Sequence, residues 1–206
     1  MRTRVKICGI TRIQDAQAAC EAGADAIGLV FYPESPRFVS HQQARGLRDA
    51  AAPFVTVVAL FVNPSRDEVE RVLERVRPGA LQFHGDEPPD FCERFGLPYL
   101  KACRVKEGVD LLEYLQPYTG ACGWLADAYV EAYGGVGTSF DWSVVPRQRP
   151  RPLILSGGLT TENVRDAIRR VRPWAVDVSS GVESAKGIKD SAKIAAFMAE
   201  VRNADG

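Results

Sequence analysis

The sequence predicts a single (β/α)8 barrel over residues 1–206. Short apolar stretches, each followed by helical or loop sequence, recur eight times at about 26 residues per unit, which is typical of alternating parallel strands and helices. Polar side chains stand at or just past the ends of different stretches: Cys8, Arg37, Gln82, His84, Asp127, Ser156 and Ser179. A closed barrel gathers these ends at one mouth, whereas the alternative, an open doubly wound sheet, spreads them along one edge.

Each element follows from a local pattern. Apolar runs and period-two alternation predict strands over residues 5–8, 26–31, 55–62, 80–83, 99–105, 124–128, 153–155 and 175–178. Helical spacing with cap and stop residues predicts helices over residues 12–21, 41–51, 63–76, 90–95, 109–115, 161–171 and 190–202. Thr11, Ser40 and Asn163 are predicted helix caps. Residues 129–139 form the longest predicted loop, and its glycines at 134, 135 and 137 either donate backbone N–H groups to a phosphate, act as a lid or connect flexibly.

Composition excludes several classes of protein. With 26 basic and 26 acidic residues the chain has no net charge, which argues against nucleic acid or an anionic membrane as partner. No apolar run reaches the ~18 residues of a membrane span, and no signal peptide opens the chain. Five cysteines without a CxxC pair argue against a disulfide framework and a zinc site, so we expect a cytoplasmic protein without a bound metal. The exposed faces of the outer helices carry no decisive apolar stripe, which leaves monomer and homodimer open.

Cys8 and Lys6 interrupt an apolar strand and share one of its faces, plausibly the barrel interior. Cys8 lies nearest the carboxyl end, where α/β proteins place their chemistry, although most free cysteines are small buried hydrophobes. Strand eight neighbours strand one in a closed barrel, so Asp177 is expected to pair with Lys6. A lysine near Cys8 would favour the thiolate.

Asp127 stands in an apolar strand, where an unpaired buried carboxylate tends to keep its proton. This makes Asp127 a candidate general acid. The alternative is a structural ion pair with Lys101 on the preceding strand.

Glycine-rich turns follow the last two strands, where barrels often build a phosphate site from backbone N–H groups and a helix N-terminus. The residues of these turns that are expected to bind phosphate are Gly157, Gly158, Ser180 and Gly181. Glycines that merely permit tight turns are the alternative reading of each motif.

Three further side chains are candidate substrate contacts. Arg37 follows Pro36 on the loop after strand two and offers a planar fork suited to a carboxylate, although most loop arginines are only solvated. Gln82 near the end of strand four and His84 just past it are possible substrate contacts, and a structural role is the alternative for His84. The only other histidine is His41, so no metal-ligand spacing exists.

Several motifs together resemble phosphoribosylanthranilate isomerase of tryptophan biosynthesis. They are Lys6-Ile7-Cys8-Gly9-Ile10-Thr11, Ser35-Pro36-Arg37, Leu81-Gln82-Phe83-His84-Gly85-Asp86-Glu87, Lys101-Ala102-Cys103-Arg104-Val105, Asp127, Gly134-Gly135-Val136-Gly137 with Phe140-Asp141-Trp142, Ser156-Gly157-Gly158-Leu159 and Asp177-Val178-Ser179-Ser180-Gly181-Val182-Glu183. The resemblance runs from Lys6 to Asp190 and is highly specific as a set.

The resemblance implies a (β/α)8 barrel and an intramolecular aldose-ketose isomerase. The reaction would be an Amadori rearrangement of N-(5-phosphoribosyl)anthranilate to 1-(2-carboxyphenylamino)-1-deoxyribulose 5-phosphate, without metal or organic cofactor. It implies Cys8 as general base, Asp127 as general acid and Arg37 as the group that holds the anthranilate carboxylate. Val136 and Ala126 depart from the residues usual at these positions, threonine and leucine.

Three other functions remain open at this point. A barrel isomerase of the histidine pathway uses a pair of aspartates, whereas strand one ends here in Cys8. A catalytically inactive barrel that binds phosphorylated metabolites as a regulatory module need not retain both Cys8 and Asp127. A thiol enzyme that acts through covalent Cys8 chemistry needs a base, and no histidine is placed for it in the sequence.

Overall fold

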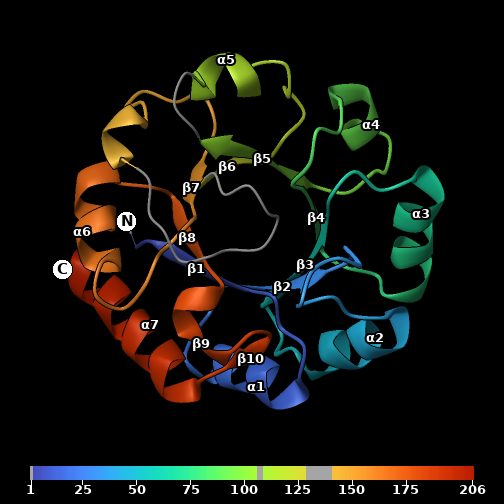
Figure 1. The fold of residues 1–206 in the computed structure, drawn as a ribbon, viewed down its shortest axis with the longest axis horizontal. Coiled ribbons are helices and arrows are strands. Elements are labelled where there is room, and N and C mark those ends of the chain that lie inside the picture. The colour runs from blue at the N-terminus through green and yellow to red at the C-terminus, as the bar shows by residue number, and fades with distance from the viewer. Residues whose placement is uncertain (1, 106–108, 129–140) are drawn as a thin grey trace.

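The computed structural model describes residues 2–105, 109–128 and 141–206, and its centre is a closed ring of eight parallel strands (Figure 1). The strands of the ring are β1 (Arg4–Cys8), β2 (Ala26–Val30), β3 (Thr56–Phe61), β4 (Ala80–Phe83), β5 (Tyr99–Val105), β6 (Gly123–Ala128), β7 (Leu153–Leu155) and β8 (Ala175–Val178). The ring closes because β8 pairs with β1, with Lys6 opposite Asp177. The predicted (β/α)8 barrel is confirmed, and the open sheet is wrong.

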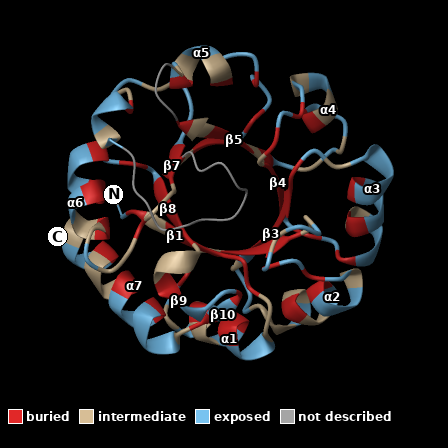
Figure 2. Ribbon diagram, viewed as in Figure 1, coloured by how far each residue is buried: buried red, intermediate tan, exposed pale blue. Residues whose placement is uncertain are grey.

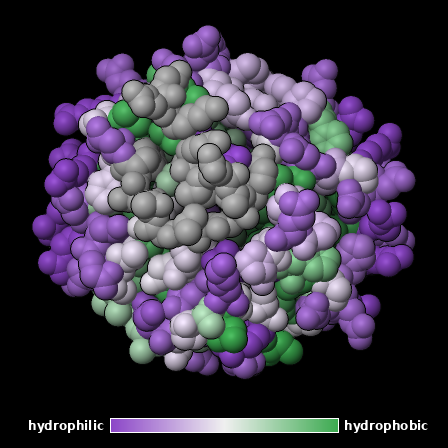
Figure 3. Space-filling model, in the orientation of Figure 1, coloured by the Kyte–Doolittle hydropathy of each residue, from purple (hydrophilic) through white to green (hydrophobic). Residues whose placement is uncertain are grey.

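Helices surround the ring and expose their outer faces (Figures 1 and 2). The described helices are α1 (Ile13–Glu21), α2 (His41–Ala50), α3 (Arg66–Arg75), α4 (Pro89–Glu93), α5 (Leu111–Leu115), α6 (Val164–Val171) and α7 (Ser191–Asp205), with the 3-10 turns η1 (Trp142–Val144) and η2 (Ser180–Val182). Hydrophilic side chains dominate the rim of the molecule over these helices (Figure 3). The burial in Figure 2 thus follows the pattern that a central sheet covered by amphipathic helices requires.

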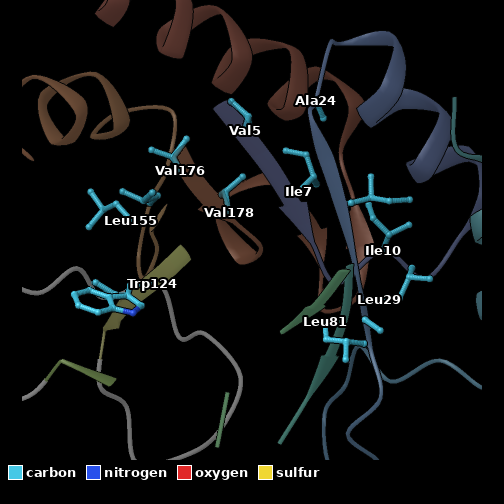
Figure 4. Close-up of a cluster of buried hydrophobic side chains, with 14 of the residues drawn as sticks. Val5, Ile7, Ile10, Ala24, Leu29, Leu81, Trp124, Leu155, Val176 and Val178 are labelled. Carbon is cyan, nitrogen blue, oxygen red and sulfur yellow. The ribbon is translucent and has the colours of Figure 1, made fainter. Parts of the chain in front are cut away.

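Strand side chains alternate between two hydrophobic layers. Val5 and Ile7 of β1 lie with Val176 and Val178 of β8 in the large cluster under the helices (Figure 4). The opposite faces fill the barrel interior, where Ala102, Leu125, Ile154 and Ala175 form a smaller cluster. Because side chains alternate with a period of two, the residues between the outward-facing ones, such as Lys6 on β1, point into the barrel interior.

The predicted bounds match β4, β5, β7 and β8, whereas several helices begin later than predicted. Helix α3 begins at Arg66 because Ser65 caps it in a reciprocal capping box with Glu68. Helix α5 likewise begins after Asp110, whose carboxylate accepts hydrogen bonds from two backbone N–H groups of its first turn. The predicted cap at Ser40 is confirmed by a second capping box.

The predicted cap at Thr11 is wrong. Arg12 occupies the cap position of α1 without a side-chain hydrogen bond, and the Thr11 hydroxyl instead donates to the backbone oxygen of Gly187. Gly187 belongs to a feature that the sequence did not reveal, an antiparallel hairpin of β9 (Glu183–Ala185) and β10 (Ile188–Lys189). This hairpin follows β8 and precedes α7.

The predicted loop, with its glycines at 134, 135 and 137, lies outside the described residues. Among the helices that the structure describes, none is long and apolar enough to cross a membrane. A cytoplasmic location and a monomeric or homodimeric state stay predictions.

Candidate active site

A pocket at the carboxyl ends of the strands collects the side chains predicted for the site. Those that line it are Cys8, Arg37, Gln82, His84, Asp127, Gly157, Gly158 and Ser180. Gly181 is absent from the lining and packs instead, because a Cβ there would lie 1.9 Å from the backbone oxygen of Leu159. The barrel therefore brings residues from β1, β4, β6 and the loops after β2, β7 and β8 to one site.

Cys8 closes β1 and is 7% exposed. Burial raises the pKa of its thiol, the charge of Lys6 lowers it, and Asp177 raises it again, so that the pKa lies above its ordinary value. Lys6 therefore favours the thiolate as expected, but burial outweighs this effect. Gly28 on β2 leaves the room for both side chains, because a Cβ there would lie 2.8 Å from Cys8 Sγ and 3.1 Å from Lys6 Cε.

The predicted ion pair of Lys6 and Asp177 is confirmed. Lys6 Nζ donates to both carboxylate oxygens of Asp177 at 2.9 Å, and both side chains are buried. Burial lowers the pKa of Lys6, but the effects of Asp177 and the neighbouring Cys8 together outweigh burial. The net result is a raised pKa, so the lysine stays protonated. A fixed positive charge thus stands beside the thiol.

Asp127 belongs to a chain of three polar side chains. Gln82 Nε2 lies 3.0 Å from His84 Nδ1, and His84 Nε2 lies 3.0 Å from Asp127 Oδ2. Because an amide nitrogen only donates, Nδ1 of His84 accepts from Gln82, and Nε2 is the ring nitrogen that donates to Asp127. Oδ1 of Asp127 then remains as the oxygen that can carry a transferable proton. His84, expected as a substrate contact, also orients the carboxyl group.

The alternative pairing of Asp127 with Lys101 is wrong. Lys101 faces the helices, where its Nζ donates to Glu87 Oε2 at 2.8 Å and to the backbone oxygen of Gly85. The register of β5 and β6 sets Arg104, not Lys101, opposite Asp127. The lysine instead holds the loop that carries His84 in place.

Arg37 is buried and does not stand free. Its Nε and Nη2 donate to the two carboxylate oxygens of Glu183 at 2.7 and 2.8 Å. Gly9, with φ +74°, makes room for it, because a Cβ there would lie 2.4 Å from Arg37 Cδ. The sequence did not identify Glu183, which lies 146 residues further along the chain, as the partner of Arg37.

The turn after β7 is shaped for close backbone approach. Gly157 and Gly158 have φ values of +83° and +65°, and a Cβ on Gly157 would lie 2.2 Å from the backbone nitrogen of Ala128. Asn163 makes no side-chain cap on α6, contrary to the prediction. Its amide instead donates to the backbone oxygen of Gly158 at 2.8 Å and accepts from the N–H of Thr160, which braces the turn.

An apolar wall completes the pocket. Val30, Leu60 and Val62 form a buried cluster with Cys8, and Tyr32 packs against it. These side chains and Arg104 line the pocket but were not singled out from the sequence. Val30, Leu60 and Arg104 lie on the inward-facing positions of β2, β3 and β5, and the period-two alternation of these strands could have identified them. Among the described residues, no group of three or more His, Cys, Asp or Glu side chains is arranged to hold a metal ion.

The fold and the site define a (β/α)8-barrel enzyme with a thiol and a carboxyl group at the mouth of the barrel. Residues 5–200 match the family model of N-(5'phosphoribosyl)anthranilate (PRA) isomerase. A relative from Dechloromonas aromatica, an N-(5'-phosphoribosyl)anthranilate isomerase, is 57% identical over 205 residues that cover 100% of this chain and 99% of the relative. The chain belongs to this family and is an isomerase.

Solved structures agree with this assignment. The phosphoribosyl anthranilate isomerase of Thermotoga maritima superposes with a TM-score of 0.91 at 43% identity, covering 98% of this chain and 99% of that one. A second structure of such an isomerase holds reduced 1-(o-carboxyphenylamino)-1-deoxyribulose 5-phosphate; its TM-score is 0.87 at 41% identity, covering 98% of this chain and 99% of that one.

Proposed function

We propose that the chain catalyses the Amadori rearrangement of N-(5-phosphoribosyl)anthranilate to 1-(2-carboxyphenylamino)-1-deoxyribulose 5-phosphate in tryptophan biosynthesis. Cys8 is the general base and Asp127 the general acid. The observation that carries the proposal is that Cys8 of β1 and Asp127 of β6 line one pocket, each held by its own polar partners. Family membership indicates the substrate, and the pocket contains groups suited to its carboxylate, its aromatic ring and its phosphate.

The reaction needs one group that gives a proton and one that takes a proton. Asp127 protonates the furanose ring oxygen, and the ring opens to a Schiff base. The thiolate of Cys8 then removes the proton at C2, and the resulting enolamine tautomerises to the ketone. The proton balance closes when the thiol returns its proton to C1 and the 2-hydroxyl gives its proton to Asp127. Each placed proton transfer contributes ~10²–10⁴-fold to the rate.

A direct assay tests the activity. The purified chain is mixed with phosphoribosylanthranilate generated in place, and the loss of anthranilate-type fluorescence is followed over time. We expect rapid loss that depends on enzyme concentration. A rate no faster than that of the spontaneous decay of the substrate, with a known family member active in parallel, would contradict the proposal.

The substrate carboxylate is assigned to Arg37. The apolar wall of Val30, Leu60 and Val62 suits the aromatic ring, and Arg37 lines the same pocket. Arg37→Ala should lower kcat/KM by roughly 10- to 150-fold, the equivalent of ~1.5–3 kcal/mol for a hydrogen bond to a charged group. Steady-state kinetics measure this change, and an unchanged kcat/KM would remove Arg37 from the site.

The substrate phosphate is assigned to the backbone N–H groups around Gly157, Gly158, Ser180 and Gly181. The positive-φ turn at Gly157 and Gly158 and the start of η2 at Ser180 support this assignment. Inorganic phosphate should raise the apparent KM without changing kcat, whereas sodium chloride at equal ionic strength should not. Crystals soaked in phosphate or sulfate should show the anion beside Gly158 and Ser180. Anion density confined to other surfaces would count against the assignment.

A further inference from the structure

Arg37 is held by a buried carboxylate that does not line the pocket. Its Nε and Nη2 bind Oε1 and Oε2 of Glu183, and the two side chains are only 6% and 5% exposed. A bidentate pair of this kind fixes the plane of the guanidinium as well as its position. Within the described residues, Nη1 has no hydrogen-bond partner, so it is the nitrogen that remains for a ligand.

Lys189 adds a second positive charge next to the pair of Arg37 and Glu183. Its Nζ lies 2.8 Å from Glu183 Oε1 and also donates to the backbone oxygen of Ser179 at 3.0 Å. Two positive charges and one negative charge leave the cluster of Arg37, Glu183 and Lys189 with a charge of +1. Burial raises the pKa of Glu183, but the hydrogen bonds of Arg37 and the charge of Lys189 lower it below its ordinary value, so the carboxylate stays ionised.

The β9–β10 hairpin holds Glu183 and Lys189 against the loops of the site. Thr11 donates to the backbone oxygen of Gly187 at its turn, and a Cβ on Gly187 would lie 3.0 Å from the backbone oxygen of Pro36. Lys193 of α7 donates to the backbone oxygen of Glu183 at 2.8 Å. The hairpin thus connects the loop after β1, the loop that carries Arg37 and helix α7.

We infer that Glu183 is a positioning residue that holds the guanidinium of Arg37 in the orientation that binds the substrate carboxylate, while Lys189 keeps the cluster positively charged. This inference rests on the proposed function and on Arg37 as the carboxylate-binding group. The cluster's single positive charge matches the single negative charge of a carboxylate. The opposite role, which the test must exclude, is that of a competitor that occupies Arg37 until the substrate carboxylate displaces it.

The sign of one binding change separates the two roles. The probes are reduced 1-(o-carboxyphenylamino)-1-deoxyribulose 5-phosphate and the same compound without its carboxyl group, each titrated by calorimetry. Glu183→Gln keeps the size of the side chain but loses one acceptor and the charge. For the carboxylated probe we expect Kd to rise roughly tenfold, the loss of one hydrogen bond to a charged group. For the other probe we expect a change of less than about twofold.

A double-mutant cycle tests whether Glu183 acts through Arg37. In the Arg37→Ala background, Glu183→Gln should change neither Kd further, because the group it positions is gone. Tighter binding of the carboxylated probe by Glu183→Gln would show a competitor, and equal weakening of both probes would show a general structural role. Either result overturns the inference.

A second variant covers a failure of Glu183→Gln to fold. Glu183→Asp keeps the charge balance with Lys189 but is too short to reach both Nε and Nη2 of Arg37, so Kd for the carboxylated probe should again rise. An unchanged Kd in Glu183→Asp overturns the inference. If the wild-type chain fails the fluorescence assay, the proposed function itself is wrong. If the wild type is active and Arg37→Ala weakens the carboxylated probe but Glu183→Gln does not, only the role of Glu183 is wrong.

Discussion

Replacing Cys8 by serine should lower kcat by ~10²-fold or more, because a serine hydroxyl ionises far less readily than a thiol and cannot replace it as general base. Substrate binding and the fold should persist, since the two side chains are nearly equal in size. Steady-state kinetics and circular dichroism of both proteins measure these effects. Retention of more than about a tenth of the wild-type kcat would make Cys8 a core thiol and not the base.

Cys103 provides the matched control for this substitution. It is a second buried thiol, 1% exposed, but it packs under the helices in the large cluster and not in the pocket. Burial raises its pKa to about 11. Cys103→Ser should therefore retain kcat while it lowers the free energy of unfolding. Cys8→Ser should lower kcat and retain the fold. Equal losses of kcat in both variants would indicate damage to the barrel and not loss of a base.

The raised pKa of Cys8 determines the expected pH dependence. A base acts only when deprotonated, so the thiolate fraction of the free enzyme, and with it kcat/KM, falls about tenfold for each pH unit below the thiol pKa. Because burial places this pKa above its ordinary value in the protein without substrate, kcat/KM should still be rising with pH through neutrality. The rising limb should disappear or shift in Cys8→Ser. A kcat/KM independent of pH from 6 to 9 in the wild type would contradict this assignment, given a reference thiol pKa of ~8.5.

Contacts that depend on strand order could be predicted from the sequence. The pair of Lys6 and Asp177 follows from closing β8 onto β1, and the shared mouth follows from the polar ends of the strands. Four strands have the predicted bounds because an apolar run between turn residues leaves little freedom. Helix starts shifted where a cap such as Ser65 stood two residues inside the predicted element.

Contacts that depend on side-chain reach could not be predicted. The strand order makes Lys101 a candidate partner for Asp127, but its position on β5 turns it towards the helices and Glu87. Glu183 meets Arg37 only because a short hairpin packs against the loops after β1 and β2. No local pattern marks β9 or β10, which have three and two residues. A single sequence reveals the strands that carry the site residues more readily than the side-chain pairs that orient those residues.

Asp127→Asn is expected to have the second large effect, a loss of ~10²-fold or more in kcat with little change in stability. The amide keeps the shape of the carboxyl group, and its oxygen can still accept the hydrogen bond from His84 Nε2, now 3.0 Å from Asp127 Oδ2. It has no acidic proton to give to the ring oxygen. Stopped-flow or steady-state fluorescence measures kcat, and urea titration measures the free energy of unfolding.

Asp177→Asn is the matched control, because the same chemical change meets a different environment. Asp177 neutralises the buried Lys6, which would be left without its partner, so this variant should lose ~3–5 kcal/mol of stability. Asp127→Asn should cost less, since the side chain of Asp127 is 24% exposed at the pocket whereas that of Asp177 is 5% exposed. A loss of stability in Asp127→Asn as large as that in Asp177→Asn would make Asp127 a structural carboxylate. Retention of kcat within about tenfold would exclude Asp127 as the general acid, because loss of a placed acid removes ~10²-fold or more.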